Sequence, residues 1–486
     1  MGSSVSLMIR GLLAIVLMVG FYLLALAIAG GLLYLPYAEV VYAHRIHPKL
    51  VIFCLLATGT ILWAIMPRVD KFEAPGPQLQ EGRFPDLFRE LKAIASATQQ
   101  TMPGEVYLVG DMNAWVAERG GLMGFGGRRV MGIGLPLLQL LSVSQFAGVL
   151  AHEFGHYYGG DTKLGPWIYK TRAAIGRTLA GLGDSMLQWP FRWYGKVFLW
   201  ITLAISRRQE YTADSLAASV VGSKTMAEGL KKVHGGGLVF DQYWQNSIVP
   251  VLNSGFLPQF RVGFEKHLQA ADKEQLVDKI AAEIIKTDKG SLYDTHPALK
   301  DRLGALEKLN APAKSERSQP AISLLGPKVS DVENELWRFT IRADALPKFK
   351  PIRWDQVGHD VHVPFWKKIL ADHAAGLRGN KIGQLSDLLK DLPGLRLKLY
   401  KQDIALPGDD MDKRAVNLMQ LGLAVALHDH GWTVQAEPGT TVICRLQDVE
   451  LKPFALINDL KDGKMTREEW AALCEQHQLA NLPIVA

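Results

Sequence analysis

The chain has 486 residues, of which 48% are hydrophobic and 21% are charged. This mixture excludes an intrinsically disordered chain, because such chains carry too few apolar side chains to form a core. The net charge of +6 comes without a long basic run, so it favours a membrane-facing surface and argues against a nucleic-acid partner.

The chain contains three cysteines, Cys54, Cys444 and Cys474. Cys54 lies in an apolar run, whereas Cys444 and Cys474 could in principle pair. An odd and sparse set without short spacings argues against a disulfide framework and against a cysteine zinc site. A reducing compartment is therefore favoured.

The N-terminal part of the chain predicts a two-helix transmembrane anchor over residues 1–67. Residues 11–38 carry no charge, and a helix of this length exceeds the ~30 Å hydrocarbon core of a bilayer. Residues 50–67 form a second uncharged stretch, near the lower length limit for a span. Two spans would leave both flanks of the anchor on the same side of the membrane.

Positive charges around these two stretches set the expected orientation. The outer flanks carry one more basic residue than the connection between the spans: Arg10, Arg68 and Lys71 against Arg45 and Lys49. By the positive-inside rule, we expect the bulk of the protein in the cytoplasm.

The next folded region, residues 85–310, is predicted to combine helices with a small β-sheet. Apolar periodicity predicts a helix at 88–98, strands at 105–110, 113–116 and 129–133, and a helix at 146–158. Ser142 and Gln145 match a capping box at the start of the helix 146–158.

Residues 164–206 are apolar and rich in tryptophan and tyrosine, but basic residues interrupt them: Arg172, Arg177, Arg192 and Lys196. Aromatic and basic residues at this density are typical of a membrane interface. We therefore expect a membrane-associated hairpin, with a buried core helix as the alternative. A separate helix is predicted at 207–221.

The C-terminal part is predicted to be a linker at 311–345 and an α+β accessory domain of unknown role at 346–486. The composition of residues 311–319 (APAKSERSQ) is typical of a linker. The accessory domain has these predicted elements: helices at 366–375 and 414–430, strands at 432–436 and 441–446, and a final helix after the capping box of Thr466 and Glu469.

A cluster of polar residues stands near the start of the accessory domain. His359, Asp360 and His362 lie between Trp354 and Trp366. A second metal site is one interpretation of this cluster, and a polar turn is the other.

A metal-binding motif lies at residues 151–160, which read AHEFGHYYGG. In a helix, His152 and His156 lie on one face, so two imidazoles can bind one ion. Glu153 can then reach a water on that ion. Zinc lowers the pKa of such a water to about 7, and a carboxylate accepts its proton during attack on a carbonyl. The pattern H-E-x-x-H therefore predicts a catalytic zinc site with Glu153 as its base.

A third protein ligand is needed, because catalytic zinc takes three and keeps one position open. Glu210, in the run RRQEYTADSLAA, is the candidate. Asp214 lies one turn later, where it could accept a hydrogen bond from a zinc-bound His152. The alternative is a solvated helix face beside Arg207 and Arg208.

The order of these motifs resembles the integral-membrane gluzincins that include the heat-shock protease HtpX and the type I CAAX prenyl proteases. The resemblance covers roughly residues 85–310 and is carried by Asn113-Ala114, Gly134-Leu135, VLAHEFGH, EYTADSLAA and THPALKDRL. It implies a mainly α gluzincin catalytic domain with a small edge sheet, and one Zn²⁺ per chain held by His152, His156 and Glu210.

The resemblance also implies supporting roles for other residues. His296 would donate a hydrogen bond to the oxyanion, and Arg302 would pair with Asp214. Read without the family, His296 before a proline is a loop or helix-start residue. The predicted edge strand at Asn113 and Ala114 would bind the substrate backbone, as exposed sheet edges bind extended peptides.

The sequence therefore predicts a zinc metalloendopeptidase of the bacterial inner membrane that cleaves membrane or membrane-proximal polypeptides on the cytoplasmic side. A non-proteolytic, zinc-stabilised adaptor or chaperone is the alternative. A prenyl-protein processing enzyme would need more firm spans than two. The chain also departs from the family, because charges break the interval between the two zinc motifs and residues 346–486 match no family pattern.

Overall fold

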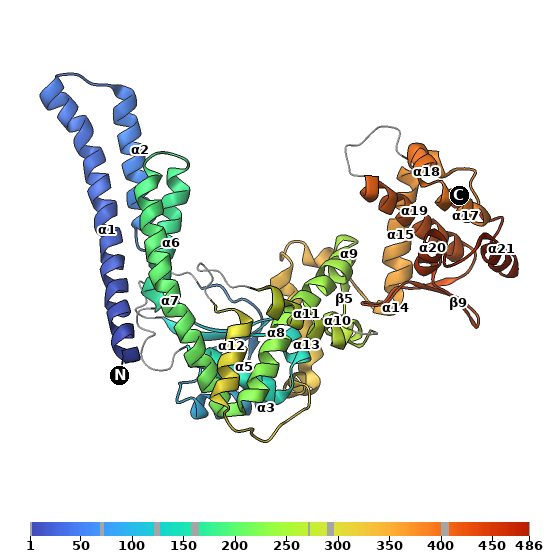
Figure 1. Cartoon of the computed structure of the whole chain (residues 1–486), viewed down its shortest axis with the longest axis horizontal. Helices are drawn as coiled ribbons and strands as arrows, with labels where there is room; N and C mark the ends of the chain where they lie inside the picture. The colour runs from blue at the N-terminus through green and yellow to red at the C-terminus, as the bar shows by residue number, and fades with distance from the viewer. Residues whose placement is uncertain are drawn as a thin grey trace. The chain divides into compact units, whose positions relative to one another are not determined.

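The computed structural model describes residues 2–68, 72–120, 127–156, 165–270, 273–288, 296–399 and 408–485. The predicted flank charge Lys71, the predicted helix end at Tyr158 and Thr295 of the THP motif lie outside these ranges. The chain divides into two compact units, one formed by Met1–Gly237 with Val277–Thr340 and the other by Leu238–Leu276 with Ile341–Ala486. Helices dominate both units, and the sheets are small, as the sequence predicted (Figure 1).

The first unit begins with two long apolar helices, α1 (Gly2–Ala43) and α2 (Pro48–Ile65). Within the described residues, two segments are long and apolar enough to cross a membrane: Gly11–Ala43, with mean hydropathy 2.8, and Pro48–Ile65, with mean hydropathy 1.9. Many of their large apolar side chains are exposed. The two predicted N-terminal membrane helices are therefore present as candidate spans.

Two further helices, α6 (Gly165–Leu182) and α7 (Gln188–Val221), pack beside α1 and α2 (Figure 1). The four helices share one apolar core, which includes Phe21, Ile61, Ile175 and Phe198. Several tryptophans of α7 remain exposed: Trp189, Trp193 and Trp200. The hairpin at 164–206 is thus helical, and its association with the membrane stays a prediction.

Two of the three arginines that interrupt this hairpin in sequence, Arg172 and Arg177, make polar contacts inside the four-helix group, whereas Arg192 is exposed. Arg172 Nη2 donates to Thr202 Oγ1 at 2.8 Å, and Arg177 Nε donates to Ala64 O at 3.0 Å. Because a buried charge costs less when it is hydrogen-bonded, these contacts let the arginines remain among apolar helices. They join α6 to α7 and to α2.

Helix α7 is longer than the sequence analysis predicted. Its 34 residues run without interruption from Gln188 to Val221, about 50 Å at ~1.5 Å per residue. The predicted boundary at Arg207 does not exist, because residues 197–206 contain neither glycine nor proline to break the helix. One rigid helix therefore connects the apolar group with the segment that carries Glu210.

A four-stranded sheet lies in the first unit, in the order β1-β2-β4-β3. Its strands are β1 (Gln78–Leu79), β2 (Glu105–Val109), β3 (Ala114–Arg119) and β4 (Arg128–Gly134). β2 and β4 are parallel, and β3 pairs antiparallel with β4 in the register Ala114↔Ile133. The predicted strand near Asn113 is therefore an edge strand. Helices α3 (Pro85–Ala97) and α4 (Leu135–Leu140) complete this region.

Helix α5 (Val143–Gly155) carries the metal-binding motif. The predicted capping box starts it: Gln145 N donates to Ser142 Oγ at 3.2 Å, and Ser142 N donates to Gln145 Oε1 at 3.1 Å. At its other end, Gly155 lies so close to α7 that a Cβ would be 2.7 Å from Ala213 Cα. Only glycine permits this approach, which brings the histidines of α5 next to the carboxylates of α7.

Residues 311–320, here called the strap, cross the start of α5. Val143 N donates to Gln319 O at 2.9 Å, and Arg317 N donates to Ser144 Oγ at 2.8 Å. The Arg317 guanidinium forms two 2.6 Å bonds with the Glu90 carboxylate of α3. The segment predicted as a linker thus holds two helices, and the chain after it is also ordered as η3 (Ala321–Lys328) and α13 (Val329–Thr340).

Removing the Arg317 side chain should destabilise the first unit. Glu90 is 9% exposed, so Arg317→Ala leaves a buried carboxylate without its charged partner. Such a loss costs about 1–3 kcal/mol. Urea unfolding measures this cost, with Lys92→Ala, an exposed cation of the same helix α3, as the matched control. Equal unfolding free energies for the two variants would refute the clamping role of the strap.

The first unit also contains most of α8 (Ser223–Tyr243), much of α11 (Lys273–Thr287) and α12 (Leu299–Leu309). The second unit begins on α8 and continues through η2 (Trp244–Ile248), α9 (Val249–Asn253), β5 (Phe256–Pro258) and α10 (Phe260–Gln269). β5 pairs in parallel with β6 (Lys350–Ile352), which ties residues 238–276 to the C-terminal part of the chain.

The rest of the second unit is helical around a three-stranded sheet. Its elements are α14 (Trp354–Val357), η5 (Gly358–His362), α15 (Val363–Asp372), α16 (Ala374–Leu377), α17 (Leu385–Lys390), α18 (Leu392–Leu399), α19 (Gly408–Asp429), β7 (Thr433–Gln435), β8 (Ile443–Leu446), β9 (Val449–Leu451), α20 (Pro453–Lys461) and α21 (Arg467–Gln476). The predicted capping box of Thr466 and Glu469 starts α21. Cys54, Cys444 and Cys474 are all free and buried.

Candidate active site

The centre of the site is built by α5 and α7. α5 presents His152 in its last turn and His156 at its C-cap on one face, and α7 presents Glu210 opposite them. The ligand atoms of these three residues all lie within 4.8 Å of one another. His152 Nε2 is 3.5 Å and His156 Nε2 is 3.6 Å from the Glu210 carboxylate. The structure thus brings together the three residues predicted as metal ligands.

The cluster fits a metal ion by its chemistry. Two imidazole nitrogens and one carboxylate oxygen are a donor set of catalytic zinc. Within the part of the chain that the structure describes, Glu210 Oε2 is a buried oxygen without a close hydrogen bond, because its partners His152 Nε2 and Arg302 Nη1 are both 3.5 Å away. Such an atom is costly to bury, and a cation held between the three side chains would satisfy it.

Asp214 lies one turn after Glu210 and contacts His152. His152 Nδ1 donates to Asp214 Oδ1 at 2.9 Å, which directs Nε2 of the ring toward Glu210. Burial favours the neutral imidazole, but the hydrogen bonds with Asp214 and Glu210 outweigh it and raise the pKa of His152 to about 9. Metal binding must displace a proton from this ring, and Asp214 then keeps the ring oriented.

Arg302 of α12 holds Asp214 from the other side. Its Nε donates to Asp214 Oδ2 at 2.8 Å, and its Nη2 donates to Oδ1 at 2.6 Å. Burial alone would raise the pKa of Asp214, but the bonds with Arg302 and His152 keep it below its ordinary value. The pairing of Arg302 with Asp214, implied by the family resemblance, is present in the structure.

His296 lies against the cluster at the start of the segment leading to α12. Its Nδ1 is 2.9 Å from Glu210 Oε1, and its side chain is 61% exposed. Burial acts against ionisation of Glu210, but the hydrogen bonds with His152 and His296 place the pKa of Glu210 well below its ordinary value. His296 is therefore at the mouth of the site, and its role toward an oxyanion stays a prediction.

Glu153 follows His152 on α5 and is half-buried. Burial raises the pKa of its carboxyl to about 7, above the ordinary value for glutamate, although the charge of His152 opposes this shift. A carboxylate that accepts a proton near neutral pH has the basicity that a general base requires. Burial and the charge of His152 also lower the pKa of His156 to about 4, so its imidazole is neutral.

The predicted substrate-binding residues lie on the sheet edge. Gly134 N donates to Asn113 O at 2.8 Å, and Ala114 pairs with Ile133. These contacts fix one side of β3 to β4, and β3 is the terminal strand of the sheet. β3 also packs against α5, so the edge strand and the histidines belong to one local assembly.

His234 was not predicted as a site residue. Its Nδ1 bonds to Leu230 O at 2.8 Å within α8. Burial lowers the pKa of His234, and the nearby charges of Arg302 and His296 lower it further. The ring therefore lies in the electrostatic field of the site. The only sequence signal was its position before three glycines.

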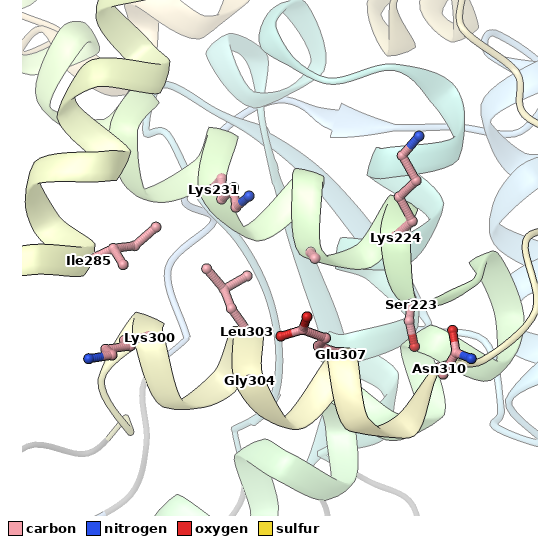
Figure 2. A pocket seen from close by; sticks show the side chains of 10 residues that line it. Ser223, Lys224, Lys231, Ile285, Lys300, Leu303, Gly304, Glu307 and Asn310 are labelled. Atoms are coloured by element: carbon pink, nitrogen blue, oxygen red, sulfur yellow. The ribbon is translucent and has the colours of Figure 1, made fainter.

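A separate groove of about 590 Å³ lies between α8, α11 and α12 (Figure 2). Its lining includes Lys224 and Lys231 of α8 and Leu303 and Glu307 of α12. None of its lining residues belongs to the cluster of His152, His156 and Glu210. α12 thus lines the groove and also supplies Arg302 to the site.

Comparison with known proteins identifies the region that carries this cluster. The model of peptidase family M48 matches residues 81–310. A protease HtpX homolog of Pseudarthrobacter chlorophenolicus is 24% identical over 250 residues, which are 48% of this chain and 75% of the relative. One of Thermodesulfovibrio yellowstonii is 22% identical over 258 residues, 47% of this chain and 77% of the relative. No solved structure matches the chain. Residues 81–310 are therefore similar to the peptidases of family M48, and these two relatives of the chain are HtpX homologs.

Proposed function

We propose that the protein is a membrane-anchored, zinc-dependent endopeptidase. The observation that carries this proposal is the cluster of His152, His156 and Glu210, with the half-buried Glu153 on the same helix as the two histidines. A structural zinc site does not require a carboxylate base beside its ligands. This arrangement therefore favours hydrolysis over a purely structural role.

In this proposal, His152, His156 and Glu210 hold one zinc ion per chain. When bound, zinc lowers the pKa of water to about 7 and polarises the scissile carbonyl. Glu153 accepts the proton of the attacking water and passes it to the leaving amine. Asp214 and Arg302 fix the orientation of His152, and His296 donates a hydrogen bond to the oxyanion.

The proposed substrate is an extended polypeptide. It would pair with the edge strand β3 near Asn113 and Ala114, because backbone pairing binds a peptide without selecting much of its side-chain sequence. The N-terminal candidate spans support substrates in or near a membrane. The balance of positive charges supports a catalytic domain on the cytoplasmic side of a bacterial inner membrane.

Metal removal tests the proposal. The detergent-purified full chain is treated with a chelator, dialysed, and assayed on an unfolded protein before and after addition of zinc chloride. We expect one zinc ion per chain in the cluster, loss of cleavage on chelation and recovery with zinc. Cleavage that survives complete removal of metal from the cluster would refute the proposal. Bound zinc without cleavage of any unfolded or membrane substrate would favour the adaptor alternative.

A further inference from the structure

The second unit contains a histidine pair that the proposed peptidase reaction does not use. His359 Nδ1 and His428 Nε2 lie 2.9 Å apart, although 69 positions separate the two residues in the chain. Their rings are 5.0 Å apart between centroids, at an interplanar angle of 36°. We propose that His359 and His428 form a second binding site, for a divalent transition-metal ion such as Zn²⁺.

The outer nitrogen of His428 is within hydrogen-bond distance of a carboxylate, and that of His359 has a carboxylate nearby. His428 Nδ1 is 3.0 Å from Asp429 Oδ1, and His359 Nε2 is 3.8 Å from Asp360 Oδ1. Metal-binding histidines usually have a carboxylate or carbonyl at the nitrogen that does not bind the metal, since this contact fixes the tautomer and raises ligand basicity. The inner nitrogens, Nδ1 of His359 and Nε2 of His428, share one proton in the structure, and a metal ion would replace that proton between them.

The backbone holds His359 in place. It lies in η5, a single π-helical turn of residues Gly358–His362, and such turns occur frequently at functional sites. Gly358 packs so closely against β7 that a Cβ would lie 2.1 Å from Val434 O. The turn is therefore fixed to the sheet, and the next residue projects toward the end of α19, where His428 lies.

The distances and charges suit a small cation. At metal–nitrogen distances of about 2.0–2.1 Å, two nitrogens on a tetrahedral ion lie about 3.4 Å apart, so the pair must open by about half an ångström. His359 is 67% exposed and can move by this amount. Asp360 and Asp429 contribute two negative charges, and Lys367, 2.6 Å from Asp429, contributes one positive charge. Imidazole ligands suit zinc, nickel and copper, and water would complete the coordination.

His362 has a different role from the one that its position in the sequence suggested. Its ring stacks on Trp366, with centroids 5.5 Å apart and an interplanar angle of 15°. His359 instead finds its partner on another helix. The sequence left a local metal site or a polar turn open for residues 359–362, and the pair of His359 with His428 is one that only the fold creates.

Zinc stoichiometry of the full chain tests this site. Wild type, His359→Ala and His156→Ala proteins are dialysed against buffered zinc chloride, and bound metal is measured by mass spectrometry. We expect two equivalents in wild type and one in each variant, with proteolysis unchanged in His359→Ala. Asp429→Asn should lower the zinc affinity of the second site roughly 10–100-fold. His430→Ala, at the same end of α19, is the matched control and should keep both equivalents.

The outcomes separate this site from the proposed active site. A second equivalent that survives in His359→Ala and His428→Asn, or a wild type that binds only one, would overturn the proposal. Failure of His156→Ala to lose an equivalent would instead count against the zinc ligands of the peptidase. Circular dichroism of each variant excludes unfolding as the cause of a lost equivalent.

Discussion

Replacing Glu153 with glutamine should lower the rate of peptide cleavage by about 10²–10⁴-fold, the usual contribution of a general base. Zinc should remain bound, because the three ligands His152, His156 and Glu210 are untouched. Glutamine has nearly the shape of glutamate but cannot accept a proton at neutral pH. Initial cleavage rates on an unfolded protein, measured with zinc content on the same samples, check both parts of this expectation.

The matched control is Glu307→Gln. Glu307 lies on α12 in the groove of Figure 2, outside the zinc cluster, and undergoes the same chemical change. It should keep wild-type cleavage and zinc content. Full proteolysis in Glu153→Gln would exclude Glu153 as the base. Equal losses in both variants would point to general destabilisation.

The parts of the site that the sequence predicted are those encoded by local patterns. The helix α5 was predictable because its capping box of Ser142 and Gln145 and its apolar face all lie within a few turns. The i, i+4 spacing of His152 and His156 needs nothing but a helix. Glu210 and Asp214 share one turn in the same way, so their common direction also followed from spacing.

The features that the sequence did not predict depend on contacts between distant segments. The strap joins Arg317 to Glu90, 227 positions away, and composition alone marked this segment as a linker. His359 and His428 meet only because Gly358 packs on β7 and α19 ends beside it. No periodicity within either segment carries that information.

Two other elements that the sequence analysis did not predict do have a local signal in the sequence. After the strap, Val332, Leu336 and Trp337 follow one another at helical spacing, and all three are buried in α13. The continuous α7 was also readable, because no helix breaker separates its apolar part from Glu210. In both cases polar or charged residues suggested a boundary, whereas an amphipathic helix accommodates them on its outer face.

The second large effect is expected at Arg302, which is 5% exposed and is paired with Asp214, itself 2% exposed. Arg302→Leu removes the two-pronged bond to a buried carboxylate and leaves the protonated His152 as its cationic partner, so the unfolding free energy should fall by about 1–3 kcal/mol. His152 still bonds Asp214, but the carboxylate loses the two hydrogen bonds from Arg302 that orient it. Zinc affinity should therefore fall roughly 10–100-fold as well. Urea unfolding of the metal-free protein and zinc competition with a chelator measure the two effects.

Two comparisons make this prediction specific to the buried pair. Arg302→Lys keeps the charge but not the two-pronged bond. Its unfolding free energy and zinc affinity should therefore lie between those of wild type and Arg302→Leu. Arg89→Leu removes an exposed arginine that contacts Asp86 on α3 of the same unit, and it should cost only about 0–1 kcal/mol. If Arg302→Leu is no less stable than Arg89→Leu, the buried pair does not stabilise the site.

The pH dependence of the Arg302 effect has a definite sign. The pKa of Asp214 in the folded chain is below its ordinary value. Its contribution to the unfolding free energy is therefore complete above the unfolded pKa of about 3.9 and declines as the pH falls through the lower folded pKa. The stability difference between wild type and Arg302→Leu should be largest near neutral pH and should shrink in acid. A difference that grows on acidification would mean that the carboxylate of Asp214 is not the charge that Arg302 stabilises.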